Sequence, residues 1–250
     1  MDNSLLVSLS HQLAAYRAMD VIANNIANVS TPGFKREAAK FEEFVTMMRP
    51  AEGQTGLQPV SFVKDAGVMR DVSQGNLEQT GATYDVAIAG NGFFQVQTPT
   101  GMRYTRDGHF SLDNNGNLVT SLGYPVQGDG GAITIAPTDG QIVVAPDGTI
   151  SSVLNGVTNL LGKFKVVDFP STAALVKQGS NLYSTTQTPN TPAVVGVRQG
   201  ALEASNVQPV IEISHMIEVM RAYEATASLT KSQEDLMRQA INELGQMPTN

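Results

Sequence analysis

The chain has 250 residues, enough for one large domain or two small ones. Its formal net charge is −7, from 16 Lys and Arg against 23 Asp and Glu, and this acidic balance disfavours a nucleic-acid partner, whose phosphates require a basic surface. The absence of cysteine excludes disulfides and thiolate-bound metals. The first residues lack the basic and apolar regions of a secretory signal peptide, and no apolar run approaches the ~20 residues of a membrane-spanning helix, so we expect neither.

The first element is predicted to be a long helix. Between Asn3 and Val29 there is neither Gly nor Pro, and apolar residues recur three and four positions apart. One apolar stripe contains Leu6, Leu9, Leu13 and Tyr16, and a second contains Met19, Ile22, Ile26 and Val29. Pro32 and Gly33 end the helix, because Pro disfavours helical geometry in the residue before it and Gly turns without steric cost.

The middle of the chain is predicted to be rich in strands. All but one of the 23 Gly lie between Gly33 and Gly200, the exception being Gly245. Turns between short strands use Gly often, whereas long helices tolerate it badly. Short runs of β-branched and aromatic residues separated by Gly-containing turns predict a compact all-β domain over 73–200 rather than a parallel α/β sheet.

The segment 34–72 is predicted to be a junction between the first helix and the β domain. Phe41, Phe44, Val45 and Met48 have the spacing of a short amphipathic helix, and 50–56 is predicted to be a loop. A surface connection without function is the alternative interpretation of this segment.

Two turns imitate ligand sites. Gly90-Asn91-Gly92 is interpreted as a hairpin turn between two short strands, because it lacks the third Gly and the following helix of a dinucleotide site. The run 113–117 begins like a calcium loop, but that loop needs Gly where Leu118 stands and an acidic residue where Tyr124 stands. We therefore expect ordinary turns at both places, and no cofactor or metal.

The last element is predicted to be a second long helix, because 210–244 again has neither Gly nor Pro. Ser205 or Asn206 can cap it, and Pro209 fits its first turn. A heptad seam contains Met216, Val219, Tyr223, Thr226, Thr230, Gln233, Met237, Ala240 and Leu244; a second stripe contains Ile213, Ile217 and Met220, and a third Leu229 and Leu236. One partner helix cannot cover so many faces, which indicates packing with other copies; a simple two-helix hairpin on the β domain is the alternative.

No catalytic site is predicted. The three histidines, His11, His109 and His215, show no metal-ligand spacing. There is no nucleophile elbow and no phosphate-binding loop.

Three regions of the sequence resemble signatures of one family. Ala23-Asn24-Asn25-Ile26-Ala27-Asn28, followed by Thr31 and Gly33-Phe34-Lys35, resembles the N-terminal signature of the flagellar rod, hook and hook-associated protein family. The runs 92–94, 104–106 and 116–120, together with Gly123, are similar to the signature of that family's central β domain. The runs 202–207 and 221–225 resemble its C-terminal signature, with 202–207 expected to begin the terminal helix.

The resemblance implies an α+β fold in which helices within 1–33 and 201–250 pair as an antiparallel coiled coil, with the β domain between them. It implies a structural subunit of the periplasmic flagellar rod, exported unfolded through the flagellar type III apparatus without a cleaved signal. Copies of the chain and other rod proteins would pack into a helical tube around an export channel, and the helices would become ordered on assembly. The predicted assembly interface contains Leu9, Leu13, Tyr16, Met19, Ile22, Asn25, Ile26, Asn28, Phe34, Asn206, Ile213, Ile217, Met220, Tyr223, Met237 and Leu244.

Within the family, the start of the chain, the form of the turn at 29–34 and the length resemble a proximal-rod member. A distal-rod member is the close alternative, and a hook protein is a weaker one because hook subunits usually carry an additional domain. A different class remains open, namely a β-rich carbohydrate-binding module or enzyme with a helical tail. Growth into rods or tubes with rising concentration would favour the structural class, and sugar binding by a monomer the other.

Overall fold

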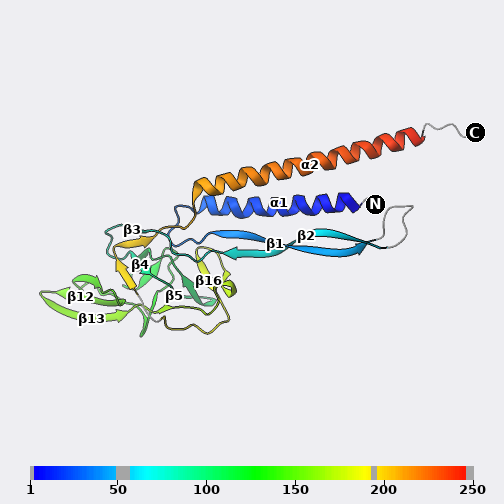
Figure 1. Ribbon diagram of the computed structural model, residues 1–250. Coiled ribbons are helices and arrows are strands. Elements are labelled where there is room, and N and C mark those ends of the chain that lie inside the picture. The colour runs from blue at the N-terminus through cyan, green and yellow to red at the C-terminus, as the bar shows by residue number, and fades with distance from the viewer. Residues whose placement is uncertain (1–2, 49–56, 193–195, 246–250) are drawn as a thin grey trace, which may run out of the picture. The chain divides into compact units, whose positions relative to one another are not determined.

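The computed structural model describes residues 3–48, 57–192 and 196–245 (Figure 1). The chain divides into two compact units, each built from separated stretches of sequence. The helical unit takes its described residues from 3–27, 37–69 and 208–245, and the β unit takes them from 28–36 and 70–207. The segment predicted to be a junction is therefore shared between the two units.

The helical unit contains α1 (Asn3–Ala27) and α2 (Pro209–Gly245), which run side by side in opposite directions (Figure 1). Gln12 Nε2 donates a hydrogen bond to Thr230 Oγ1 over 3.3 Å, and Asn25 Nδ2 donates to Glu212 Oε2 over 2.9 Å. These contacts join the middle of α1 to the later part of α2 and the end of α1 to the start of α2. The predicted antiparallel pair of terminal helices is thus confirmed.

The predicted heptad seam of α2 is its less exposed face over most of its length. Six of its members are half-buried: Met216, Val219, Tyr223, Thr226, Thr230 and Gln233. Met237 and Ala240 near the end of α2 are exposed, and the side chain of Leu244 lies outside the described residues. The face toward α1 is therefore partly polar, which explains why the sequence shows a seam with a polar middle.

The start predicted for α2 at 202–207 is wrong. Residues Ala201–Glu203 form a strand, β18, in which Leu202 lies opposite Glu78, so pairing with a distant segment takes the backbone that a helix would use. Ser205 does not cap the helix; its hydroxyl accepts a hydrogen bond from Val207 N. The helix begins at Pro209, whose missing N–H costs nothing in a first turn.

The helix predicted around Phe44 and Val45 is also wrong. Glu37–Met48 forms β1, which pairs with β2 (Gln58–Arg70) in a two-stranded sheet. The hydrogen bonds that stabilise this segment come from a strand beyond the predicted loop 50–56, which lies outside the described residues, and local spacing cannot reveal such a partner. Within the helical unit, the sheet contacts α1 through an ion pair between Arg17 Nε and Asp65 Oδ2 at 3.3 Å.

The β unit is built from short antiparallel strands, as predicted. They are β3 (Leu77–Gln79), β4 (Val86–Ala89), β5 (Phe93–Thr98), β6 (Gly101–Thr105), β7 (Phe110–Leu112), β8 (Leu118–Thr120), β9 (Gln127–Gly128), β10 (Gly131–Ala132), β11 (Gln141–Val144), β12 (Thr149–Leu154), β13 (Val157–Lys163), β14 (Val166–Val167), β15 (Val176–Lys177), β16 (Leu182–Ser184), β17 (Gly196–Gln199) and β18. A five-stranded sheet has the order β14-β5-β6-β16-β15, and a three-stranded sheet has the order β11-β12-β13. Two-stranded pairs β3–β18, β4–β17, β7–β8 and β9–β10 complete the unit.

The two turns that imitate ligand sites have different outcomes. The 113–117 turn is confirmed: it joins the paired strands β7 and β8, and the Asp113 carboxylate accepts hydrogen bonds from the backbone N–H groups of Asn115 and Asn117. The hairpin predicted at Gly90-Asn91-Gly92 is wrong, because β4 pairs with β17 while β5 pairs with β6. A side chain at Gly92 would lie 2.7 Å from Val166 Cγ1. Glycine therefore fits the point where the chain passes from the β4–β17 sheet to the five-stranded sheet that contains β5.

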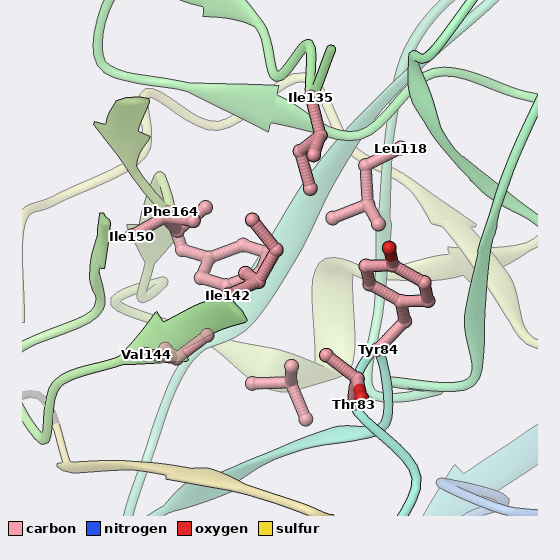
Figure 2. A pocket seen from close by; sticks show the side chains of 9 residues that line it. Thr83, Tyr84, Leu118, Ile135, Ile142, Val144, Ile150 and Phe164 are labelled. Carbon is pink, nitrogen blue, oxygen red and sulfur yellow. The ribbon is translucent and has the colours of Figure 1, made fainter. Parts of the chain in front are cut away.

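The core of the β unit packs around three phenylalanines. The ring centroid of Phe94 lies 5.2 Å from that of Phe110 and 5.5 Å from that of Phe164. Beside Phe164 the packing leaves a hollow of about 10 Å³. Figure 2 shows the side chains around it: Thr83, Tyr84, Leu118, Ile135, Ile142, Val144, Ile150 and Phe164. A hollow of this size has no room for a substrate.

We expect Leu118→Ala to lower the free energy of unfolding of the β unit by about 2–5 kcal/mol, because it enlarges this hollow without polar compensation. Leu118 is 2 % exposed, whereas Leu122 on the following turn is 52 % exposed. Leu122→Ala is therefore the matched control and should stay within about 0.5 kcal/mol of wild type. Urea unfolding measures both, and equal losses in the two variants would contradict the packing described here.

Candidate functional site

Three charged side chains from distant parts of the sequence meet inside the β unit. The Glu203 carboxylate accepts a hydrogen bond from Lys35 Nζ at 2.5 Å and one from Arg106 Nη1 at 3.1 Å. The backbone N–H of Gly75 donates a third, at 3.0 Å. All three charged side chains are at most 4 % exposed. This buried charge cluster, Lys35–Glu203–Arg106, ties the segment after α1 to the end of β6 and to β18.

Backbone groups complete the buried charge cluster. Lys35 Nζ also donates to Ser73 O at 2.7 Å, and Arg106 Nη2 donates to Gly90 O at 2.8 Å. Burial lowers the pKa of Lys35 and the pKa of Arg106, and the Glu203 carboxylate opposes the lowering in both cases. The Glu203 carboxylate, held between two cations and a backbone amide, is not exposed to a substrate, and its removal would leave two buried cations without their partner.

The turn at Gly33 brings Lys35 to the buried charge cluster. Gly33 has φ +68°, and a Cβ there would lie 2.5 Å from the backbone carbon of Arg106. Its N–H donates to Glu203 O at 2.7 Å. Only glycine therefore allows the chain to pass this close to Arg106, and this passage places Lys35 in the buried charge cluster.

Two asparagines from the predicted assembly interface bind backbone of their own chain. In the helical unit, Asn25 is fully buried; its Oδ1 accepts from Glu37 N at 2.9 Å, and its Nδ2 donates to Glu37 O at 2.7 Å and to Glu212 Oε2. In the β unit, Asn206 Oδ1 accepts from Arg36 N at 2.7 Å, and Asn206 Nδ2 donates to Asp71 O at 3.0 Å. The amide groups of both residues are thus committed within the subunit.

The remaining predicted interface residues differ in how far their side chains are exposed to solvent. Phe34 is 1 % exposed, and Lys177 Nζ lies 4.4 Å from the centroid of its ring, so it is not available to a neighbouring chain. Half-buried positions are Met19, Ile22, Ile26, Asn28 and Tyr223. Exposed positions are Leu9, Leu13, Tyr16, Ile213, Ile217, Met220 and Met237. The structure also exposes Val210, Leu229, Leu236 and Ile241, which that set lacks.

The sequence prediction did not find the buried charge cluster, although each member lies inside a family-like signature. The signal that could have found it is one acidic and two basic residues embedded in motifs rich in Gly and apolar residues, where an unpaired charge would be costly. In the described part of the chain no group of acidic or histidine side chains is arranged to hold a metal ion. No described helix is long and apolar enough to span a membrane.

These features define a class of protein. Both helices carry exposed apolar stripes, and the charged groups inside the β unit are paired with one another. Exposed apolar stripes on paired helices and internally paired charges are typical of a structural protein.

Comparison with known proteins agrees with this class. Residues 5–35 match the flagella basal body rod protein family, residues 87–152 the flagellar hook protein FlgE/F/G D1 domain, and residues 198–243 the flagellar basal body rod FlgEFG protein C-terminal domain. Lys35, Arg106 and Glu203 fall one in each matched region.

Relatives match over almost their whole length. The flagellar basal-body rod protein FlgF of Caulobacter vibrioides is 44 % identical over 99 % of this chain and 100 % of its own. FlgG of Buchnera aphidicola is 40 % identical over 96 % of this chain and 99 % of its own, and FlgG of Bacillus subtilis is 33 % identical over 97 % and 99 %. The chain belongs to the flagellar basal-body rod protein family. It is a structural protein and not an enzyme.

We expect Glu203→Ala to lower the free energy of unfolding of the β unit by about 3–5 kcal/mol, because it leaves Lys35 and Arg106 buried without their shared carboxylate. Glu78→Ala is the matched control, since Glu78 is exposed and lies on β3, the strand that pairs with β18. Thermal and urea unfolding followed by circular dichroism measure the difference. If Glu203→Ala and Glu78→Ala had the same free energy of unfolding, the buried charge cluster would not stabilise the unit.

The stability of the β unit should also depend on Asp71 in acid. The Asp71 carboxylate accepts hydrogen bonds from Ser73, whose side chain and backbone N–H lower the pKa of Asp71 in the folded chain. The ionised form therefore stabilises the folded state above the unfolded pKa of about 3.9, and this contribution is lost as the pH falls through the lower folded pKa.

Asp71→Asn cannot titrate in this range, so its unfolding free energy should fall less steeply than that of wild type as the pH drops below about 4. Urea unfolding at a series of pH values measures both slopes. Ser73→Ala should flatten the slope in the same direction, because it removes the larger of the two Ser73 contributions. Equal slopes in wild type and Asp71→Asn would contradict this role.

Proposed function

We propose that this chain is a proximal-rod subunit whose helices pack with those of neighbouring copies and of other rod proteins. The helices would line a helical tube that encloses the export channel and transmits torque in the periplasmic part of the basal body. The subunit would reach this place unfolded, through the flagellar type III export apparatus. The observation that carries the proposal is the exposed apolar surface on both α1 and α2.

That surface follows helical spacing on each helix. On α1, Leu9, Leu13 and Tyr16 are between 48 % and 62 % exposed although they form a regular apolar stripe. On α2, Ile213 and Ile217 are 49 % and 45 % exposed. Scattered exposed apolar residues are normal on a soluble protein, but periodic stripes on two paired helices indicate further helical partners.

The symmetry of such contacts determines the assembly. If one face of the helical unit binds a different face of the next copy, and the rotation between copies does not close a ring, the contacts generate a helical filament. This expectation matches a tube better than a closed dimer. The identity of 44 % to a FlgF protein supports a proximal-rod position, and the 40 % identity to a FlgG protein keeps a distal-rod position as the alternative.

The double variant Leu13→Gln with Ile217→Gln should lose concentration-dependent assembly, because it places a polar amide in both stripes. Sedimentation velocity over a range of concentrations, with electron microscopy of the largest species, measures the loss. The monomer should unfold at nearly the wild-type urea concentration, because exposed substitutions change stability by only about 0.5 kcal/mol.

The matched control is His11→Gln with Glu218→Gln, which introduces the same amides at exposed polar positions on the same two helices. It should assemble like wild type. If the control and the stripe variant assemble equally well, the helical stripes are not the assembly surface. If wild type itself stays monomeric at every concentration, self-assembly through the helices is refuted.

A further inference from the structure

The end of the β unit is bonded to several separate earlier parts of that unit. We call residues 196–207 the closing strap. Its first strand, β17, pairs with β4 in the register Gly196↔Ala89, and its second, β18, pairs with β3 in the register Ala201↔Gln79. β3 and β4 have these strands as their neighbours in two-stranded sheets, so each depends on the closing strap for its pairing.

Backbone hydrogen bonds of the closing strap also reach the segments between strands. Val197 N donates to Pro146 O, Gly200 N to Asp85 O, and Ala204 N to Asn76 O, each over 2.8 Å. Val197 and Ala201 are themselves 5 % and 1 % exposed. Without the strap, these acceptors and the apolar residues under it would face water.

One side chain of the closing strap joins it to the three-stranded sheet. Gln199 Oε1 accepts from Val144 N at 3.0 Å, and Gln199 Nε2 donates to Ile142 O at 3.0 Å and to Thr83 O at 2.9 Å. The Gln199 amide thus makes hydrogen bonds with the open edge of β11 that a neighbouring strand would otherwise make. The position of β11 in the unit depends on a residue 55 positions later in the chain.

The closing strap also brings the acidic member of the buried charge cluster. Lys35 and Arg106 are supplied by the earlier chain, and in the described part of the chain Glu203 is the residue whose carboxylate hydrogen-bonds to them. A β unit that had packed before the strap arrived would enclose two cations without that carboxylate. Such a state is strongly disfavoured, because removing one partner of a buried ion pair leaves an uncompensated charge.

We propose that the closing strap is the obligatory last piece of the β unit, so that the unit has no stable folded form until residues 196–207 are available. A chain made from its N-terminus then stays open until synthesis has passed residue 207. A narrow export channel requires a chain that is still unfolded. This link to export rests on the proposed function, whereas the folding order of the β unit does not.

Native-state hydrogen exchange on the full-length monomer tests the folding order. Amides of the closing strap, such as those of Val197, Gly200 and Ala204, should lose protection together with amides of β5 and β6 as urea is added, with the same slope. This coincidence is expected because opening the strap opens the whole unit. Strap amides that exchange through a smaller opening, while β5 and β6 stay protected, would overturn the proposal.

A pair of double variants gives a second test. Gln199→Ala with Glu203→Ala removes the two side chains by which the closing strap holds β11 and the buried cations. Gln97→Ala with Glu78→Ala makes the same changes on β5 and β3, outside the strap. The strap variant should lose protection throughout β4, β5 and β6, and the control should retain it.

If the amides of β5 and β6 are as protected from exchange in the strap variant as in wild type, the β unit can fold without the closing strap and the proposal is wrong. These measurements use monomer below the concentration of assembly. A failure of self-assembly would therefore count against the proposed function alone, and a strap that opens by itself would count against this inference alone.

Discussion

The Glu203 carboxylate has to neutralise two cations in a place that water does not reach. Taking three charges out of water is expensive, and the expense is offset only when every charge keeps close, well-oriented partners. The close passage of the backbone at Gly33 and Gly75 follows from this requirement: a Cβ at Gly75 would lie 2.0 Å from Ala204 O. The turn after α1, the end of β6 and the path of β18 are thus fixed by one set of contacts.

Buried polar contacts define the path of the chain where it leaves each unit. Asn25 binds both backbone groups of Glu37. Asn206 binds the N–H of Arg36, the residue that precedes Glu37. An apolar side chain of similar size would leave these backbone groups unpaired, which costs more than a hydrogen bond normally contributes. Two amides therefore specify the positions of adjacent residues, and the signature in which Asn25 lies has a role in folding within the subunit.

The features that the sequence predicted correctly are those with local causes. Two stretches without Gly or Pro gave the terminal helices, and frequent Gly-containing turns gave the antiparallel β unit. The failures involve partners far away in the sequence. Phe44 and Val45 fit a helix by spacing but lie on β1, which pairs with β2, and Leu202 fits a helix start but pairs with β3. The apolar stripes were visible in the sequence as helical spacing, whereas the charge cluster was missed because Glu203 lies 97 residues from Arg106 and 168 residues from Lys35.

The division of the chain has a mechanical consequence. The backbone passes from one unit to the other after residues 27, 36, 69 and 207, so four covalent connections join them. A domain attached by a single linker transmits force through one backbone, and that linker can swivel. Here a load applied to the helices is shared among four backbones, and twisting any one of them also strains the other three. A subunit connected in this way can pass a mechanical load between its two units through the covalent backbone, without relying on noncovalent contacts alone.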